Sequence, residues 1–126
     1  MASSFTFSKH EKLCSTKIIE KVFQGKKVLH LFPFSIYYQF CDLPHTVPVQ
    51  VAFGVSKKFF KKAVDRNRVK RLMREAFRMN KATIYQAINK QQLAIIIVYH
   101  AKKILPYKEV EKNWTDSLKE LKKIWL

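Results

Sequence analysis

The chain has 126 residues and carries 25 Lys and Arg against nine Asp and Glu, a formal net charge of +16. Its length suits a single domain over residues 1–126, and its 48% hydrophobic content is enough to fill a core, so a disordered chain is disfavoured. The charge must therefore lie on a folded surface, where it predicts a polyanionic partner, either nucleic acid or an acidic membrane surface.

The first predicted element is a helix. Ser8 to Glu11 has the Ser-x-x-Glu spacing of a capping box, which is typical of a helix start. Gly25 ends the apolar run that follows at mostly helical intervals, which consists of Leu13, Ile18, Ile19, Val22 and Phe23. We therefore expect the first helix between about Ser8 and Gly25.

Strands follow this helix. Period-two alternation predicts strands from about Phe34 to Phe40 and from Val47 to Val55, joined by the turn-rich segment 42–45, and residues 28–31 are a candidate for a further short strand. Residues 93–99 are apolar without alternation, which is typical of a strand covered on both faces. After Pro106, an apolar stripe predicts a last helix: Val110, Trp114, Leu118, Leu121 and Trp125.

A basic helix is predicted from about Ala63 to Met79. Its apolar residues recur at helical spacing, as Val69, Leu72, Met73, Ala76 and Phe77. Residues 57–81 hold eleven basic and two acidic residues, a net +9 that is more than half of the total charge. On a helical wheel the outer face collects Asn67, Lys70, Arg71, Arg74, Arg78 and Lys81. Arg66 lies beside the buried edge, and Arg71 and Glu75 form an expected i,i+4 pair.

This basic helix and the loop before it predict a surface that binds phosphate. Arginine predominates from residue 66 to residue 78, and its planar guanidinium suits bidentate phosphate contacts. Ser56 offers a hydroxyl to phosphate, or acts only as a turn residue. Asn67 can bind phosphate, a base edge or its own backbone. The alternative for the whole segment is a solvated helix face without a partner.

The ordered pattern of residues 54–58 (Gly-Val-Ser-Lys-Lys) and 63–78, with Arg66-Asn67-Arg68 at its centre, resembles the protein subunit of bacterial ribonuclease P. The resemblance implies a two-layer α/β sandwich similar to ribosomal protein S5 domain 2, in the order α-β-β-(β)-α-β-α, with a left-handed βαβ crossover around the basic helix. It also implies that a catalytic RNA subunit removes the 5′ leader of precursor tRNA with Mg²⁺ held mainly by RNA, while the protein contacts both RNAs.

The resemblance carries over to individual positions. The residues expected to bind the catalytic RNA are Ser56, Lys57, Lys58, Lys61, Lys62, Arg66, Asn67, Arg68, Lys70, Arg71, Arg74 and Arg78. The loop departs from the family pattern, because Phe59-Phe60-Lys61-Lys62 stands where Gly-Lys is common. A cleft between the first helix and the sheet is expected to hold the leader, with Ile19, Phe23, Tyr37 and Gln39 as its candidate residues. For Phe23, ordinary core packing is an equally weighted alternative.

The sequence offers little for catalysis by the protein itself. The four histidines are scattered without ligand or triad spacing, and Asp65 is more simply a helix N-cap than a metal ligand. Cys14 and Cys41 lack Cys-x-x-Cys spacing, which argues against structural zinc. We therefore expect no catalytic or metal-binding residue in this chain.

Three classes of function remain open from the residues. A subunit of a ribonucleoprotein endonuclease is the primary hypothesis, and a non-catalytic RNA-binding module, such as a ribosomal protein or an RNA chaperone, is the alternative. A helix-turn-helix DNA reader is disfavoured because strands, and no short helix, precede the basic helix, so no DNA partner is expected. Since residues 1–7 lack the features of a signal peptide and no apolar run of about 18 residues occurs, a cytoplasmic protein without a membrane partner is expected.

Overall fold

The computed structural model describes residues 9–44, 46–88 and 91–125. After a short 3₁₀ turn at Lys9–Glu11, its elements are α1 (Thr16–Gln24), β1 (Val28–Leu31), β2 (Phe34–Phe40), β3 (Val49–Val55), α2 (Ala63–Ile88), β4 (Leu93–Tyr99) and α3 (Tyr107–Trp125). This order confirms the predicted one, including the short strand at residues 28–31. Within the described residues, no helix has the length and apolar character needed to cross a membrane.

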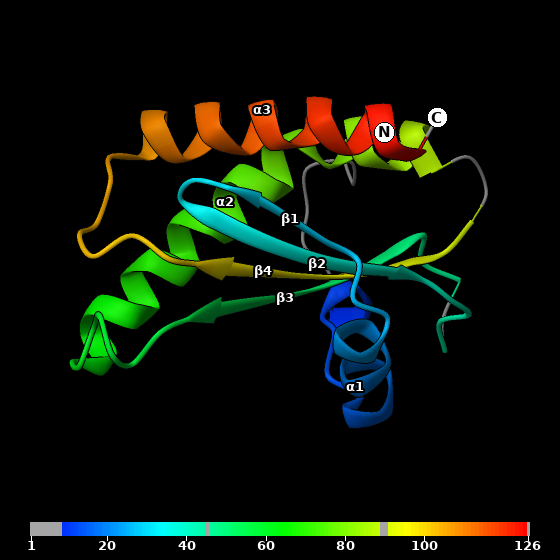
Figure 1. Cartoon of the computed structure of the whole chain (residues 1–126), viewed down its shortest axis with the longest axis horizontal. Helices are drawn as coiled ribbons and strands as arrows, with labels where there is room; N and C mark the ends of the chain where they lie inside the picture. The colour runs from blue at the N-terminus through cyan, green and yellow to red at the C-terminus, as the bar shows by residue number, and fades with distance from the viewer. Residues whose placement is uncertain (1–8, 45, 89–90, 126) are drawn as a thin grey trace.

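The four strands form one sheet in the order β1-β2-β4-β3. The neighbours are antiparallel except for β3 and β4, which run parallel and are joined by α2. Figure 1 shows α2 and α3 over one face of the sheet and α1 against the other. The predicted fold class is confirmed, and the basic helix forms the crossover between the parallel strands.

The strand β4 is central in the core because its side chains are buried on both faces. Leu93, Ile95 and Ile97 belong to the larger cluster under α2 and α3, whereas Ala94 and Ile96 belong to the smaller cluster under α1. This arrangement explains why the sequence of β4 lacks alternation. The predicted stripe of α3 is also confirmed, since Trp114 and its neighbours in the stripe pack into the larger cluster.

The start of the first helix differs from the prediction. Ser8 lies outside the described residues, and Glu11 ends a 3₁₀ turn instead of belonging to a capping box. The helix α1 begins at Thr16, where the Ser15 side chain accepts a hydrogen bond from the Ile18 N–H at 3.4 Å. Ser15 is therefore the N-cap, and Glu11 has a different partner.

That partner is Lys81, which the helical wheel had placed wrongly on the solvent-facing side of α2. Lys81 and Glu11 are each 4% exposed, and the lysine Nζ lies 3.0 and 3.1 Å from the two carboxylate oxygens. The Tyr85 hydroxyl donates to the same carboxylate, and its burial, followed by this bond, raises the pKa of Tyr85. These three residues, the Glu11 clip, tie the N-terminal segment to α2.

The helix α2 is also longer than predicted, since it ends at Ile88 and not near Met79. Ile84 and Ile88 are fully buried and continue the apolar face, and Lys81 lies among them because its charge is paired. Asp65 is in the first turn of α2 and is not the N-cap, because the helix begins two residues earlier.

Substitution of Lys81 by Met tests the Glu11 clip. Because it leaves the Glu11 carboxylate buried without its cation, we expect a loss of about 3–5 kcal/mol in the free energy of unfolding, measured by urea denaturation. The same substitution at the exposed Lys119 is the control and should change stability by less than about 0.5 kcal/mol. Equal stabilities of the two variants would contradict a buried ion pair.

Candidate nucleic-acid interface

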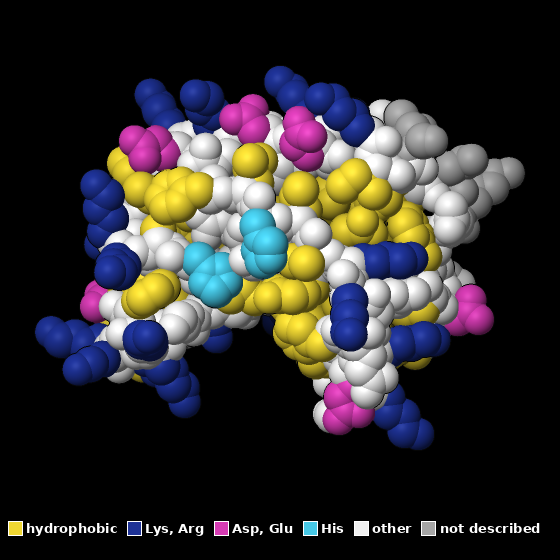
Figure 2. Space-filling view, in the orientation of Figure 1, with side chains coloured by type: hydrophobic (Ala, Val, Ile, Leu, Met, Phe, Trp, Pro, Cys, Tyr) yellow, Lys and Arg dark blue, Asp and Glu magenta, His cyan; other side chains and the backbone are white. Residues whose placement is uncertain are grey.

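The first half of α2 presents a cationic outer face. Val69, Met73 and Phe77 are buried against the sheet, and the exposed side of the same turns carries Asn67, Arg68, Arg71 and Arg74. Figure 2 shows Lys and Arg side chains gathered at the lower left, over the start of α2 and the loop before it. The predicted amphipathic helix with a basic outer face is therefore present.

The loop between β3 and α2 is held from within. The Ser56 Oγ accepts a hydrogen bond from the Lys58 N–H at 3.1 Å, and the Ser56 carbonyl accepts one from the Phe60 N–H. Phe60 is 7% exposed and packs near the Tyr99 ring, so it anchors the loop to the core. Ser56 thus has the role of a turn residue, and the loop exposes its lysines, namely Lys57, Lys58, Lys61 and Lys62.

Arg66 and Arg68 have different environments, and Arg66 lies beside the buried edge of the helix, as predicted. The Arg66 Nη1 donates to the carbonyl oxygens of Phe60 and Lys61 at 2.8 and 2.9 Å, which fixes the loop against the first turn of α2. Arg68 is exposed. Part of the Arg66 guanidinium is therefore occupied by structure, while Arg68 presents its side chain to solvent.

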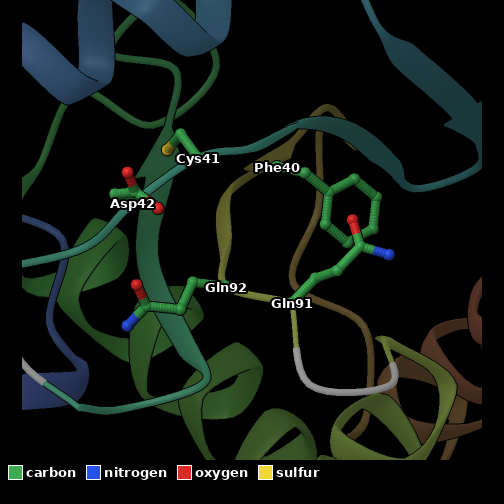
Figure 3. Close-up of a pocket in the computed structure, with 5 residues that line it drawn as sticks. All are labelled: Phe40, Cys41, Asp42, Gln91 and Gln92. Atoms are coloured by element: carbon green, nitrogen blue, oxygen red, sulfur yellow. The ribbon is translucent and has the colours of Figure 1, made fainter.

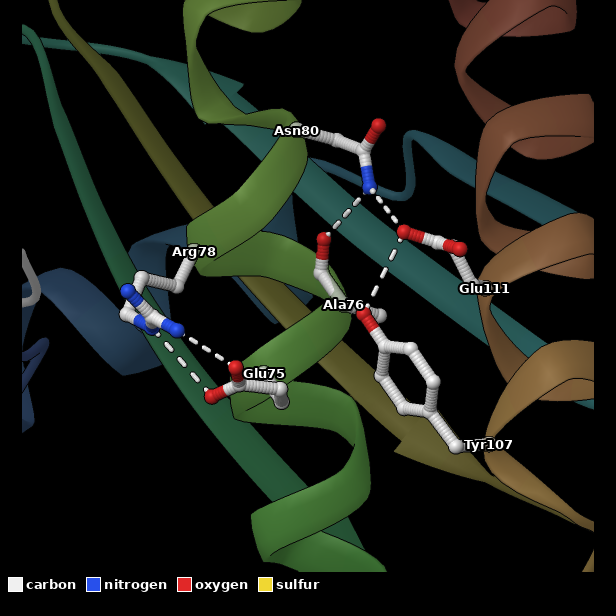
Figure 4. A network of polar contacts seen from close by, with 6 residues as sticks. All are labelled: Glu75, Ala76, Arg78, Asn80, Tyr107 and Glu111. Atoms are coloured by element: carbon white, nitrogen blue, oxygen red, sulfur yellow. Dashed lines mark hydrogen bonds and ion pairs between the residues drawn. The ribbon is translucent and has the colours of Figure 1, made fainter. Parts of the chain in front are cut away.

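Arg78 is likewise engaged within α2. Its guanidinium binds the Glu75 carboxylate, as Figure 4 shows, and this contact lowers the pKa of Glu75. The expected Arg71–Glu75 pair is therefore wrong, because Glu75 takes a partner three residues later in the helix. As a result the exposed Arg71 is left to bind other groups.

A neighbouring network joins α2 to α3. The Asn80 side-chain nitrogen donates to the Ala76 carbonyl and to the Glu111 carboxylate, which also accepts a bond from the Tyr107 hydroxyl (Figure 4). Burial and the Glu111 charge raise the pKa of Tyr107 to about 12. This network orients α2 relative to α3.

The four predicted leader-binding residues lie on the α1 side of the sheet. Tyr37 and Ile19 are half-buried in the smaller cluster, and the Phe23 ring lies edge-on to Tyr37 with centroids 4.9 Å apart. Phe23 remains 45% exposed, so it is not an ordinary core residue. Gln39 lies beneath the end of α1, where a Cβ on Gly25 would come within 2.4 Å of its Oε1.

Lys12 is a surface cation that the sequence-based reasoning did not single out. It lines a cavity of about 270 Å³ beside Lys70 and Arg74, whose floor includes Ala52 and Phe53 of β3. The position of Lys12 depends on a bridge to Val51, 39 residues later, which no local pattern reveals.

A polar pocket of about 330 Å³ lies where β2 ends and β4 begins (Figure 3). Its Gln92 accepts a bond from the Leu43 N–H and donates to the Val47 carbonyl, so it organises the connection from β2 to β3. Cys41 also lines this pocket, and its pKa is raised mainly by burial. The polar side chain of Gln92 in this pocket therefore holds the β2–β3 connection in place.

The described residues contain no group of three or more His, Cys, Asp or Glu side chains placed to hold a metal ion. In α2 the two acidic residues are Asp65 in the first turn and Glu75, which is paired with Arg78. Residues in this part of the chain therefore do not fit a protein-borne Mg²⁺ site.

Comparisons with known proteins identify the family. The sequence model of the family described as Ribonuclease P matches residues 7–122. A protein named Ribonuclease P protein component from Porphyromonas gingivalis is 33% identical over 97 residues, which are 77% of this chain and 71% of the relative. A protein of the same name from Chlorobaculum tepidum is 55% identical over 42 residues, covering 33% of this chain and 27% of the relative.

Solved structures share the fold. The RNase P protein of Staphylococcus aureus has a TM-score of 0.70 at 21% identity, with 90% of this chain and 96% of that chain covered. The RNase P protein of Thermotoga maritima has a TM-score of 0.68 at 23% identity, with 87% and 96% covered. Since the family model spans nearly the whole sequence, the chain belongs to the ribonuclease P protein family, the protein components of a tRNA-processing ribonucleoprotein endoribonuclease.

Proposed function

We propose that this protein binds the catalytic RNA subunit of ribonuclease P and the 5′ leader of precursor tRNA, and so assists the RNA in removing that leader. The observation that supports this proposal most strongly is the exposed cationic face of α2, which carries the Arg66-Asn67-Arg68 pattern in a chain of this family. The RNA performs the chemistry, and the protein contributes binding and charge neutralisation.

The catalytic RNA contacts the outer face of α2 and the lysines of the preceding loop. Arg68 and Arg71 are exposed on successive turns, so their guanidinium groups can each reach a different phosphate of this RNA. Arg66 acts chiefly by holding the loop, which keeps Lys61 and Lys62 beside the helix start. The phosphate contacts supply most of the affinity and make it dependent on salt.

The leader contacts the α1 side of the sheet. The exposed part of the Phe23 ring offers a stacking surface, and Tyr37 supports that ring from the sheet. Ile19 adds apolar contact, and the Gln39 amide can hydrogen-bond to a base or to ribose. Stacking on an aromatic ring tolerates any base, so this surface recognises a single strand more than a sequence.

Magnesium in the holoenzyme is held mainly by RNA phosphates. Since the described side chains do not fit a metal site, the contribution of the protein is indirect: its cations bring RNA strands together and so organise the phosphates that hold the ion. The cytoplasmic location expected from the sequence stays a prediction.

Reconstitution tests the proposed function. The protein is mixed with a bacterial catalytic RNA and precursor tRNA at low Mg²⁺, and the rate of leader removal is measured with and without the protein. Because its cations reduce repulsion between the two RNAs, we expect a large rise in the rate, which shrinks as the Mg²⁺ concentration increases. No rise at any Mg²⁺ concentration would exclude the proposed function.

Substitution of Phe23 by Ala tests the stacking surface. Loss of one base–aromatic stack should weaken precursor binding to the reconstituted enzyme by about 1–3 kcal/mol and leave mature tRNA binding unchanged, as measured by equilibrium titration. Phe32→Ala is a matched control, because Phe32 is 67% exposed but lies in the β1–β2 turn, away from α1. Equal effects of the two variants would rule out a specific role for Phe23.

Substitution of Arg71 by Ala tests the catalytic-RNA face. Removing one phosphate contact should weaken assembly with the catalytic RNA and reduce the slope of log affinity against log salt by about 1. Lys119→Ala removes an exposed cation from α3 and serves as the control. An unchanged slope for Arg71→Ala would show that this arginine does not contact phosphate.

A further inference from the structure

Lys12 lies between the two proposed RNA-binding surfaces. It is exposed, and it lines the cavity of about 270 Å³ with Lys70 and Arg74 on one side. On its other side it lines a cavity of about 770 Å³, which includes Ser15 at the start of α1. The same lysine therefore borders both a cavity at the basic helix and a cavity at the start of α1, the helix that carries Ile19 and Phe23.

The backbone around Lys12 is held in place on both sides. The Leu13 N–H donates to the Val51 carbonyl at 2.9 Å, and the Gln50 Nε2 donates to the His10 carbonyl at 2.9 Å. Between these bonds, the Glu11 clip attaches the same segment to α2. Lys12 is thus presented from a fixed backbone, which lowers the entropy cost of binding a ligand.

The smaller cavity suits an anion. It brings together three cationic side chains, those of Lys12, Lys70 and Arg74, over an apolar part of β3. The ion pairs found among the described residues are Arg78–Glu75, Lys81–Glu11 and Lys123–Glu120, so none of them neutralises these three cations. A phosphate group is the anion of RNA that such a site would bind.

The strand register relates this cavity to the aromatic pair. Tyr37 of β2 is paired with Ile96 of β4, which is paired with Ala52 of β3, so the three residues form one row across the sheet. Two strand spacings separate the ends of the row, a backbone distance of about 10 Å. Tyr37 supports Phe23 at one end, and Ala52 lies in the floor of the cationic cavity at the other.

We propose that Lys12, together with Lys70 and Arg74, binds a backbone phosphate of the leader as this strand passes from the α1 cleft to the basic helix. The inference rests on the proposed function. Because the leader is joined to the tRNA at the bond that the catalytic RNA cleaves, its strand must run from the cleft toward the surface that binds this RNA. The cationic cavity lies on this route, because Ala52 in its floor shares a row of the sheet with Tyr37 and its Lys70 and Arg74 belong to α2.

The test compares Lys12→Ala with the wild type in the reconstituted enzyme. Dissociation constants are measured for a precursor with a long leader, for mature tRNA, and for the catalytic RNA with the protein. We expect precursor binding to weaken on the order of fivefold, with a salt slope lower by about 1, while the other two constants stay the same. Lys12→Arg should retain the wild-type affinity, and Lys108→Ala on α3 is the matched control.

Three results would overturn the inference. Unchanged precursor binding by Lys12→Ala would exclude a contact, and an equal loss on mature tRNA would exclude the leader as its source. A loss confined to assembly with the catalytic RNA would assign the phosphate to that RNA instead. Failure of the proposed function itself looks different, because the wild-type enzyme would then bind precursor and mature tRNA equally.

Discussion

The buried contact between Glu11 and Lys81 ties the segment before α1 to the basic helix α2, and so links the two candidate RNA surfaces. Each charge would be costly alone in the protein interior, so the carboxylate and the ammonium must remain together. Glu11 and Lys81 are separated by 70 residues in the chain, and the Tyr85 hydroxyl also donates to the Glu11 carboxylate. The pair therefore fixes the segment before α1 against the crossover helix α2, on the edge of β3.

Contacts within the protein explain why basic residues close in sequence have different roles. Lys81 is buried and holds the fold together, Arg78 is bound to Glu75, and Arg66 is bound to the carbonyls of the loop. Arg68 and Arg71 are exposed on the same helix and take part in none of the three ion pairs found among the described residues. A net charge of +9 in residues 57–81 thus divides into structural cations and cations that face solvent.

Much of the fold could be predicted from local patterns. Alternation of apolar residues predicted β2 at Phe34–Phe40, and the unbroken apolar run predicted β4 at Leu93–Tyr99. Both patterns were informative because successive side chains of a strand point to opposite faces of the sheet, so the pattern shows which faces are buried. The ordered Arg66-Asn67-Arg68 pattern led to the family that the comparisons confirm. For Phe23, leader binding and core packing both remained open from the sequence, because the exposure of its ring beside Tyr37 depends on how α1 packs on the sheet.

The wrong predictions for Glu11 and Lys81 share one cause, which is a partner distant in the sequence. The local spacing predicted a capping box at Glu11 and a solvent-facing Lys81. Neither local pattern could reveal that these two residues, 70 positions apart, pair with each other. The end of α2 was placed too early because a lysine interrupted its apolar face. No local sequence pattern indicated a role for Lys12, because its neighbours in the cavity come from β3 and α2.

In the proposed complex, α2 binds the catalytic RNA while the leader crosses from α1 to the edge of β3. A structure of the protein bound to catalytic RNA and a precursor tRNA would show both contacts at once. We expect a leader base against Phe23, a leader phosphate within hydrogen-bond distance of Lys12, and catalytic-RNA phosphates at Arg68 and Arg71. A leader that runs along α3, or a catalytic RNA that leaves the outer face of α2 uncovered, would contradict it.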